Sequence, residues 1–146
     1  MFVIAHIAAG LVLGKLTGNY YAALAGALFL DLDHMIVYAR HKVLLSPRKL
    51  WRAVTDPQDP YGNQRNIFHS LIGWLLILMI TVLGFGEAGF IFSIAYLSHL
   101  VLDFIDGSDF YPLFPFSSLN FKGPIAYFSK AEICLAAALF MIFFVV

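Results

Sequence analysis

Charged residues and cysteines are both scarce in this sequence. Only 12% of its 146 residues are charged, and nine basic residues balance nine acidic ones to give a formal charge of zero. A typical soluble domain has roughly 25% charged residues. The low and balanced charge excludes a disordered tail and a basic nucleic-acid-binding protein. The single cysteine, Cys134, excludes an internal disulfide framework, and its apolar neighbours predict a packed side chain.

Apolar residues make up 61% of the chain, which is long enough for one domain, residues 1–146. A soluble globule of this size would expose much of that apolar surface, so the composition predicts an integral membrane protein. About five segments approach the length needed to cross a bilayer. They are Phe2–Leu16, Tyr20–Tyr38, Ile67–Phe85, Ala88–Ile105 and Ala131–Val146. The expected fold is an all-α, polytopic membrane helix bundle.

The connections between these segments differ in character. Turn-forming residues at Lys15–Asn19 and Gly84–Glu87 predict tight antiparallel hairpins. The stretch His41–Arg52 mixes apolar and basic residues, as either an interfacial helix or a solvated anchoring loop would. Gly107–Ser129 is rich in aromatic residues and prolines, and we expect it to fold back over the helix ends at the membrane interface.

The basic residues predict an orientation for the bundle. Lys15 belongs to the first hairpin turn, whereas every other lysine and arginine lies in the connections at the opposite end of the predicted helices. The positive-inside rule assigns that opposite end to the cytoplasm. We therefore expect a protein of the inner membrane whose chain starts in the cytoplasm and whose C-terminus faces outward.

Histidine and aspartate gather at the predicted cytoplasmic ends of four helices. An ionisable residue in a spanning segment costs a few kcal/mol, so it normally faces the bundle interior with a partner. Residues three or four apart share a helix face, as Asp31 and His34 do, and also His99 and Asp103. Each residue alone could simply cap or pack a helix, but together they predict one cluster. Its members are His6, Asp31, Asp33, His34, His69, His99 and Asp103.

Such a cluster has the chemistry of a metal site. Imidazole nitrogen and carboxylate oxygen suit zinc above all, or manganese or iron. Seven candidate ligands exceed what one tetrahedral ion uses, so we expect two divalent ions. Arg65, four residues before His69, is either a phosphate-binding residue or a positive-inside anchor. Asp106 is either a partner that orients a histidine or a helix-end residue, and Asp109 is a weaker candidate.

Three motifs match a family pattern in the right order and spacing. They are Asp31-Leu32-Asp33-His34, Arg65-Asn66-Ile67-Phe68-His69-Ser70 and Tyr96-Leu97-Ser98-His99-Leu100-Val101-Leu102-Asp103. Together with the early His6 and the stretch Tyr111–Pro115, they resemble the YdjM-type (LexA-regulated) membrane-bound metal-dependent hydrolases over nearly the whole chain. That family is in turn distantly similar to zinc-dependent phospholipase C, an all-helical enzyme with a His- and Asp-bound metal cluster.

These observations lead to three functional hypotheses. The first is a metal-dependent hydrolase that acts at the cytoplasmic face on a phosphoester of a lipid or another amphipathic substrate, with Arg65, Asp33 and His69 as catalytic residues. The second is a metal ion transporter, although a permeation path should place polar groups through the whole membrane. The third is a non-catalytic membrane protein whose closed metal site holds the helices of the bundle together or recruits a partner.

Overall fold

The computed structural model describes residues 1–55 and 67–146, apart from the side chains of Asp33 and Val54. Within these residues the chain forms six α-helices, one short 3-10 helix and no strand. The helices are α1 Val3–Thr17, α2 Tyr20–Leu28, α3 Asp31–Arg40, α4 Pro47–Thr55, α5 Leu71–Ile105 and α6 Lys130–Val145, and the 3-10 helix is η1 Ile67–His69. The prediction of an all-α protein is confirmed.

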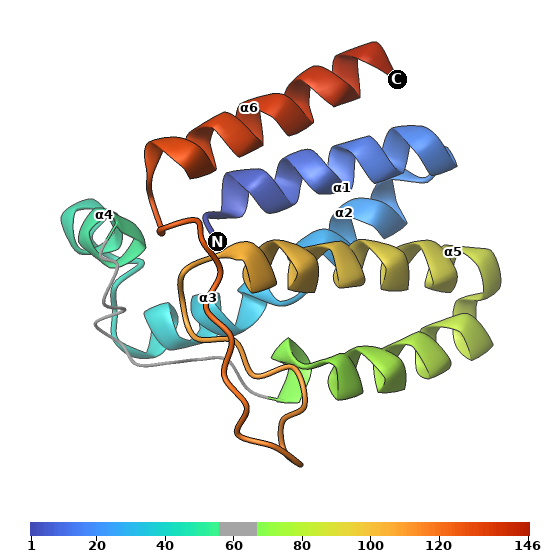
Figure 1. Cartoon of the computed structure of the whole chain (residues 1–146), viewed down its shortest axis with the longest axis horizontal. Coiled ribbons are helices and arrows are strands. Elements are labelled where there is room, and N and C mark those ends of the chain that lie inside the picture. The colour runs from blue at the N-terminus through green and yellow to red at the C-terminus, as the bar shows by residue number, and fades with distance from the viewer. Residues whose placement is uncertain (56–66) are drawn as a thin grey trace.

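The axes of helices α1, α2, α5 and α6 are roughly aligned, and these helices form a bundle (Figure 1). Helix α1 packs against α2, α5 and α6, and α2 packs against α5. Gly26 allows α2 to approach α5 closely, because a Cβ atom there would lie 2.1 Å from the carbonyl oxygen of Phe92. The starts of α1 and α6 and both ends of α5 lie at one end of the bundle, which we call the site end (Figure 1).

Helix α5 reverses direction at Gly86. This residue has φ 55° and ψ −124°, a backbone conformation that glycine adopts without steric cost. The two arms, residues 71–85 and 87–105, lie side by side (Figure 1). Thr81 Oγ1 is 2.8 Å from Ser93 Oγ, and the indole N–H of Trp74 donates to the carbonyl oxygen of Ser93 at 2.9 Å. The predicted hairpin at Gly84–Glu87 is therefore present.

Two predicted helix boundaries are wrong. The segment Tyr20–Tyr38 is divided into α2 and α3 by a bend, because Leu30 at the corner is buried with Tyr96, Leu100 and Phe110. The bend therefore depends on contacts with parts of the chain that are distant in the sequence. The next predicted helix does not begin at Ile67 but at Leu71, after η1. Ser70 caps it, since its Oγ accepts the N–H of Gly73 at 3.1 Å.

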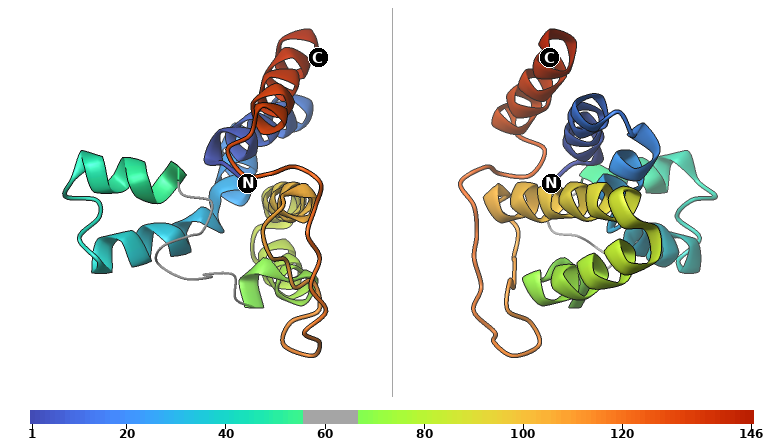
Figure 2. Two further views of the ribbon diagram at one scale, coloured as in Figure 1. Left: turned by 60° about the vertical axis from the view of Figure 1, so that its left-hand side comes forward. Right: turned by 90° about the vertical axis from the view of Figure 1, so that its right-hand side faces the viewer.

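The stretch His41–Arg52 contains most of a helix, α4, rather than a solvated loop. Together with α3, α4 projects from the site end of the bundle (Figure 2). In Figure 1 the coil of α4 is seen nearly end-on, whereas α1, α5 and α6 run across the view. Trp51 of α4 packs edge-on against Phe128, with ring centroids 6.3 Å apart. A helix is thus present in this stretch, whereas its position at the membrane interface stays a prediction.

The aromatic segment between α5 and α6 folds back on itself and on the helix ends, as predicted. Phe110 and Phe121 exchange two backbone hydrogen bonds of 3.0 and 2.8 Å. The N–H of Gly123 donates to the carbonyl oxygen of Asp106, and the N–H of Leu71 donates to that of Pro112. These bonds attach the segment to both ends of α5.

One helix among the described residues, Leu71–Ile105, is long and apolar enough to cross a membrane when its length is counted across the reversal at Gly86, with a mean hydropathy of 2.2 in its most apolar window. Only 11% of that window is buried, unlike the core helix of a soluble protein. The prediction of about five spanning helices is not confirmed by these criteria, because the other helices are shorter. Cys134 is exposed, so the prediction that it is packed was wrong: it lies on the outer face of α6.

Candidate metal centre

Five of the predicted ligands meet at the site end of the bundle, although they come from four separate elements. Helix α1 supplies His6, the start of α3 supplies Asp31, η1 supplies His69, and the second arm of α5 supplies His99 and Asp103. The bend after α2 and the 3-10 turn before α5 place Asp31 and His69 at helix junctions. Except for Asp31, which is half-buried, these residues are at most 3% exposed.

Their ligand atoms form two groups that could each hold a metal ion. The first group is His6, Asp31 and His99, and the second is His69, His99 and Asp103. Within each group the ligand atoms lie within 4.8 Å of one another. His99 belongs to both groups. The two groups are therefore parts of one cluster, in which a carboxylate, and not one imidazole nitrogen, could bridge two ions.

The orientation of His99 is set by a backbone contact. Its Nδ1 lies 2.7 Å from the carbonyl oxygen of Ala27, and because a carbonyl only accepts, Nδ1 carries the proton. Nε2 therefore faces Asp103, whose Oδ2 is 3.5 Å away. A ring nitrogen and a carboxylate that face each other share a cation, either a proton or a metal ion. An N–H fixed by a backbone carbonyl is typical of metal-binding histidines.

Other buried polar atoms of the cluster also fit a metal. Both ring nitrogens of His6 and Oδ2 of Asp31 are buried without a hydrogen-bond partner in the described part of the chain. Such an atom costs about 1–3 kcal/mol when it is left unsatisfied. The His6 ring stacks on the His99 ring with centroids 3.6 Å apart. Metal coordination would satisfy one nitrogen of His6 and the Asp31 oxygen, and such nitrogen and oxygen donors suit the predicted zinc, manganese or iron.

A positive charge already lies beside the carboxylates. The amino group of Met1 is 3.0 Å from Asp103 Oδ1 and 3.1 Å from Asp106 Oδ2. Buried carboxylates need such compensation, because an isolated charge in an apolar interior is very costly. The amino group of Met1 therefore compensates part of the negative charge of these buried carboxylates.

Comparison with known families decides where this chain belongs. The family model of the YdjM inner membrane proteins matches residues 1–146, the whole chain. The chain belongs to the YdjM inner membrane protein family. No curated protein and no solved structure matches it. Membership confirms the family resemblance and the membrane location expected from the sequence, whereas the distant similarity to phospholipase C stays a prediction.

Not every predicted site residue of this YdjM family member joins the two ligand groups. His34 lies in neither, although its ring packs edge-on to that of His69 with centroids 6.2 Å apart. Asp106 is fully buried beside the cluster and accepts a hydrogen bond of 2.6 Å from Ser108. Asp109 instead pairs with Lys122 at 3.0 Å. Arg65 and the side chain of Asp33 lie outside the part of the chain that the structure describes.

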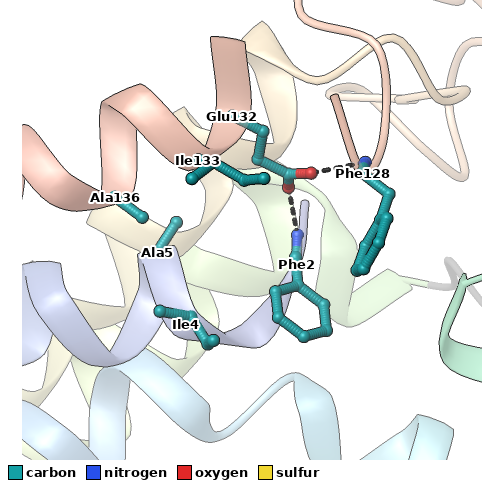
Figure 3. A pocket seen from close by; sticks show the side chains of 7 residues that line it. All are labelled: Phe2, Ile4, Ala5, Phe128, Glu132, Ile133 and Ala136. Atoms are coloured by element: carbon teal, nitrogen blue, oxygen red, sulfur yellow. Dashed lines mark hydrogen bonds between the residues drawn. The ribbon is translucent and has the colours of Figure 1, made fainter. Parts of the chain in front are cut away.

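Sequence reasoning missed one buried charge next to the cluster, Glu132. It is 3% exposed, and its carboxylate accepts the backbone N–H groups of Phe2 and Phe128 (Figure 3). Glu132 thereby ties the start of α6 to the start of α1. Its signal in the sequence was the spacing Ser129-x-x-Glu132, which is typical of a helix N-terminus. Ser129 does cap α6, but the partners of the Glu132 carboxylate come from the tertiary structure.

Proposed function

We propose that this YdjM family protein is a membrane-embedded hydrolase that uses a dinuclear metal site to cleave a phosphoester of a lipid or another amphipathic substrate at the cytoplasmic face. The observation that carries the proposal is the convergence of five histidines and aspartates from four elements on one buried cluster. Nothing in the packing of an apolar bundle requires these residue types to meet.

In this proposal His6 and Asp31 would help to hold one divalent ion, and His69 and Asp103 would help to hold the other. His99 lies in both groups, but its Nε2 would coordinate only one of the two ions, because a single imidazole nitrogen binds a single ion. Asp33 and His34 complete the predicted ligand set, and zinc is the first candidate metal. Two bound divalent ions would lower the pKa of a coordinated water and stabilise charge on the phosphoryl oxygens. Asp106 adds a further buried carboxylate beside the site.

Other residues of the chain would bind and orient the substrate. Arg65 offers a planar pair of N–H donors for two phosphoryl oxygens. Asp33 and His69 are also predicted catalytic residues, and as ligands they would act by holding the metal ions beside the reacting phosphorus. The aromatic segment 107–129 is attached to both ends of α5. In the proposed orientation it would lie at the depth where lipid head groups meet acyl chains and would cover the substrate.

The membrane arrangement belongs to the same proposal. We place α1, the pair α2–α3, the two arms of α5, and α6 across the bilayer, with the site end in the cytoplasm. At about 1.5 Å per residue, α1 and the α5 arms are about 22 to 29 Å long, close to the roughly 30 Å of a hydrocarbon core. Helix α4, which carries Arg48, Lys49 and Arg52, would then lie along the cytoplasmic surface.

The distribution of buried polar groups favours an enzyme over a transporter. Among the described residues, the buried charged side chains all belong to the site end. In the other half of the bundle, Ser93 is the buried polar side chain, and it is paired with Thr81. A permeation path would need ionisable or polar groups along its whole length.

The proposal is tested with purified full-length protein that has been stripped of metal and reloaded with zinc, manganese or iron. We expect one of these metals to support release of product from a panel of phospholipids and soluble phosphoesters. His99→Ala should abolish the activity, whereas His41→Ala, at an exposed position outside both ligand groups, should retain it. A metal-loaded protein that cleaves none of these substrates, but shows metal flux in proteoliposomes lost in His99→Ala, contradicts the proposal and supports the transporter.

A further inference from the structure

A strongly basic stretch lies outside the metal cluster, at the turn from α3 into α4 and on α4 itself. Between residues 34 and 55 the sequence holds five lysines and arginines and no acidic residue. All five side chains are exposed, and none of them forms an ion pair within the part of the chain that the structure describes. We call these residues the basic surface, and they are Arg40, Lys42, Arg48, Lys49 and Arg52.

The backbone that carries this charge is fixed by a small apolar core between α3 and α4. Four side chains form this core, and they are Tyr38, Val43, Leu50 and Ala53. The N–H of Val43 also donates to the carbonyl oxygen of Tyr38 at 2.8 Å. One side of α4 is thus turned toward α3, whereas Arg48 and Arg52, which are four residues apart and share a helix face, are exposed. The charges are therefore displayed on an ordered surface.

Large apolar side chains are exposed beside the basic surface. Leu45 in the turn is 81% exposed, and Trp51 on α4 is 64% exposed. Neither belongs to the core between α3 and α4, and the Trp51 ring meets Phe128 only edge-on. Lysine and arginine next to exposed leucine and tryptophan are typical of a helix in a membrane interface. There the apolar side chains enter the acyl region and the charges stay at the head groups.

The direction of α4 fits such an interface. Together with α3 it projects from the site end (Figure 2), and its axis crosses the direction of α1, α5 and α6 (Figure 1). In an inner membrane protein, a helix that crosses the end of the bundle lies along the bilayer surface. The positive-inside rule accounts for basic residues on this side of the membrane, but it requires neither an ordered basic face nor the exposure of Leu45 and Trp51.

We propose that the basic surface binds the phosphate head groups of anionic phospholipids, with Leu45 and Trp51 inserted among their acyl chains. An anionic head group supplies the counter-charge that the described part of the chain does not provide. The surface would thus collect anionic lipid at the site end of the bundle. This inference rests on the membrane arrangement of α4 given with the proposed function, but it requires neither a bound metal nor turnover.

The test is the quenching of Trp51 fluorescence by lipids that are brominated in their acyl chains. The chain has two tryptophans, so the metal-free, full-length protein carries Trp74→Phe. It is reconstituted in vesicles of phosphatidylglycerol and phosphatidylcholine, in which one or the other lipid is brominated. We expect phosphatidylglycerol to bind beside Trp51 about fivefold more strongly, equivalent to about 1 kcal/mol from a basic side chain near an anionic head group.

Two features of the design protect this measurement. Both leaflets contain the same lipids, so the direction in which the protein inserts does not change the quenching, and lipid binding is separated from a role in orientation. If Trp74→Phe does not fold, subtracting the signal of Trp51→Phe from that of wild type gives the same quantity.

Matched double variants show whether the preference comes from the basic surface. Arg48 and Arg52 flank Trp51 on α4, so Arg48→Gln with Arg52→Gln should bring the relative binding of the two lipids close to one. Lys122→Gln with Lys130→Gln removes the same charge at exposed positions off the basic surface and should keep the preference. In wild type, high salt should also lower it, because exposed charges are screened.

Several results would overturn the inference. They are equal quenching by the two brominated lipids in wild type, an equal loss of preference in both double variants, and a preference that high salt does not change. Absence of quenching by either lipid would place Trp51 outside the bilayer, in water or under an acidic protein, and would overturn it as well. Phosphoester cleavage is measured separately on metal-loaded protein, so the failure of one proposal is distinguishable from the failure of the other.

Discussion

At the scale of single residues, His99 has the largest predicted effect on metal binding, because it lies in both ligand groups. Its Nε2 would hold one ion, since Nδ1 contacts the carbonyl oxygen of Ala27, so we expect His99→Ala to lose that ion and to weaken the binding of the other. His6→Ala should affect only one ion, since His6 belongs to only the first group. Elemental analysis of the purified protein measures the metal content per chain. The exposed His41→Ala variant is the control and should match wild type, whereas equal losses in His6→Ala and His99→Ala would contradict the larger effect of His99.

Glu132 is expected to contribute to stability rather than to metal binding. Glu132→Ala leaves two backbone N–H groups, those of Phe2 and Phe128, without their acceptor. Each unsatisfied group costs about 1–3 kcal/mol, so the free energy of unfolding should fall by about 2–6 kcal/mol. Thermal or denaturant unfolding in detergent measures the change.

The control for this change is Glu87→Ala, which removes the chain's other glutamate at an exposed position. It should alter stability by at most about 0.5 kcal/mol. The metal content of Glu132→Ala should stay at the wild-type value, and a loss of metal in this variant would show that Glu132 supports the cluster directly.

At the scale of elements, the reversal of α5 depends on Gly86. Gly86→Ala places a side chain at φ 55° and should destabilise the protein by about 1–3 kcal/mol. Gly84→Ala is the matched control, because Gly84 is helical and a Cβ atom there meets no neighbour within 4 Å. This second change should stabilise the helix by about 0.5–1 kcal/mol. Unfolding curves of the two variants should therefore shift in opposite directions. A shift of both curves in the same direction would contradict a turn that requires glycine at position 86.

The element boundaries show how far local sequence signals reach. The glycines at 84 and 86 marked the hairpin within α5, and Ser129 and Ser70 act as caps that a sequence reader can recognise. The bend between α2 and α3 has no such signal, since Phe29 and Leu30 would continue a helix. It follows from the packing of Leu30 against residues of α5 and the aromatic segment, which only the folded chain brings near.

At the scale of the whole molecule, the basic residues predict which end faces the cytoplasm. We expect cysteines introduced by Glu87→Cys and Lys122→Cys, each in a Cys134→Ser background, to label differently with a membrane-impermeant maleimide. Glu87 lies at the reversal of α5, so its cysteine should react in intact cells. Lys122 lies in the aromatic segment at the site end, so its cysteine should react only after lysis. The reverse pattern would place the metal cluster outside the cytoplasm.

The sequence by itself determined the class of this protein and the chemistry of its site. The composition indicates a helical membrane protein, because so apolar a chain would expose much apolar surface to water as a soluble globule. The spacing of His99 and Asp103 places both residues on one helix face. Only the tertiary structure decided which residues meet. His6 stacks on His99, 93 positions away, and Ala27 orients the His99 ring, because helix packing joins segments that no local pattern relates. Ala5 and Ala136 likewise pack in one apolar cluster only because α1 and α6, far apart in the sequence, lie side by side.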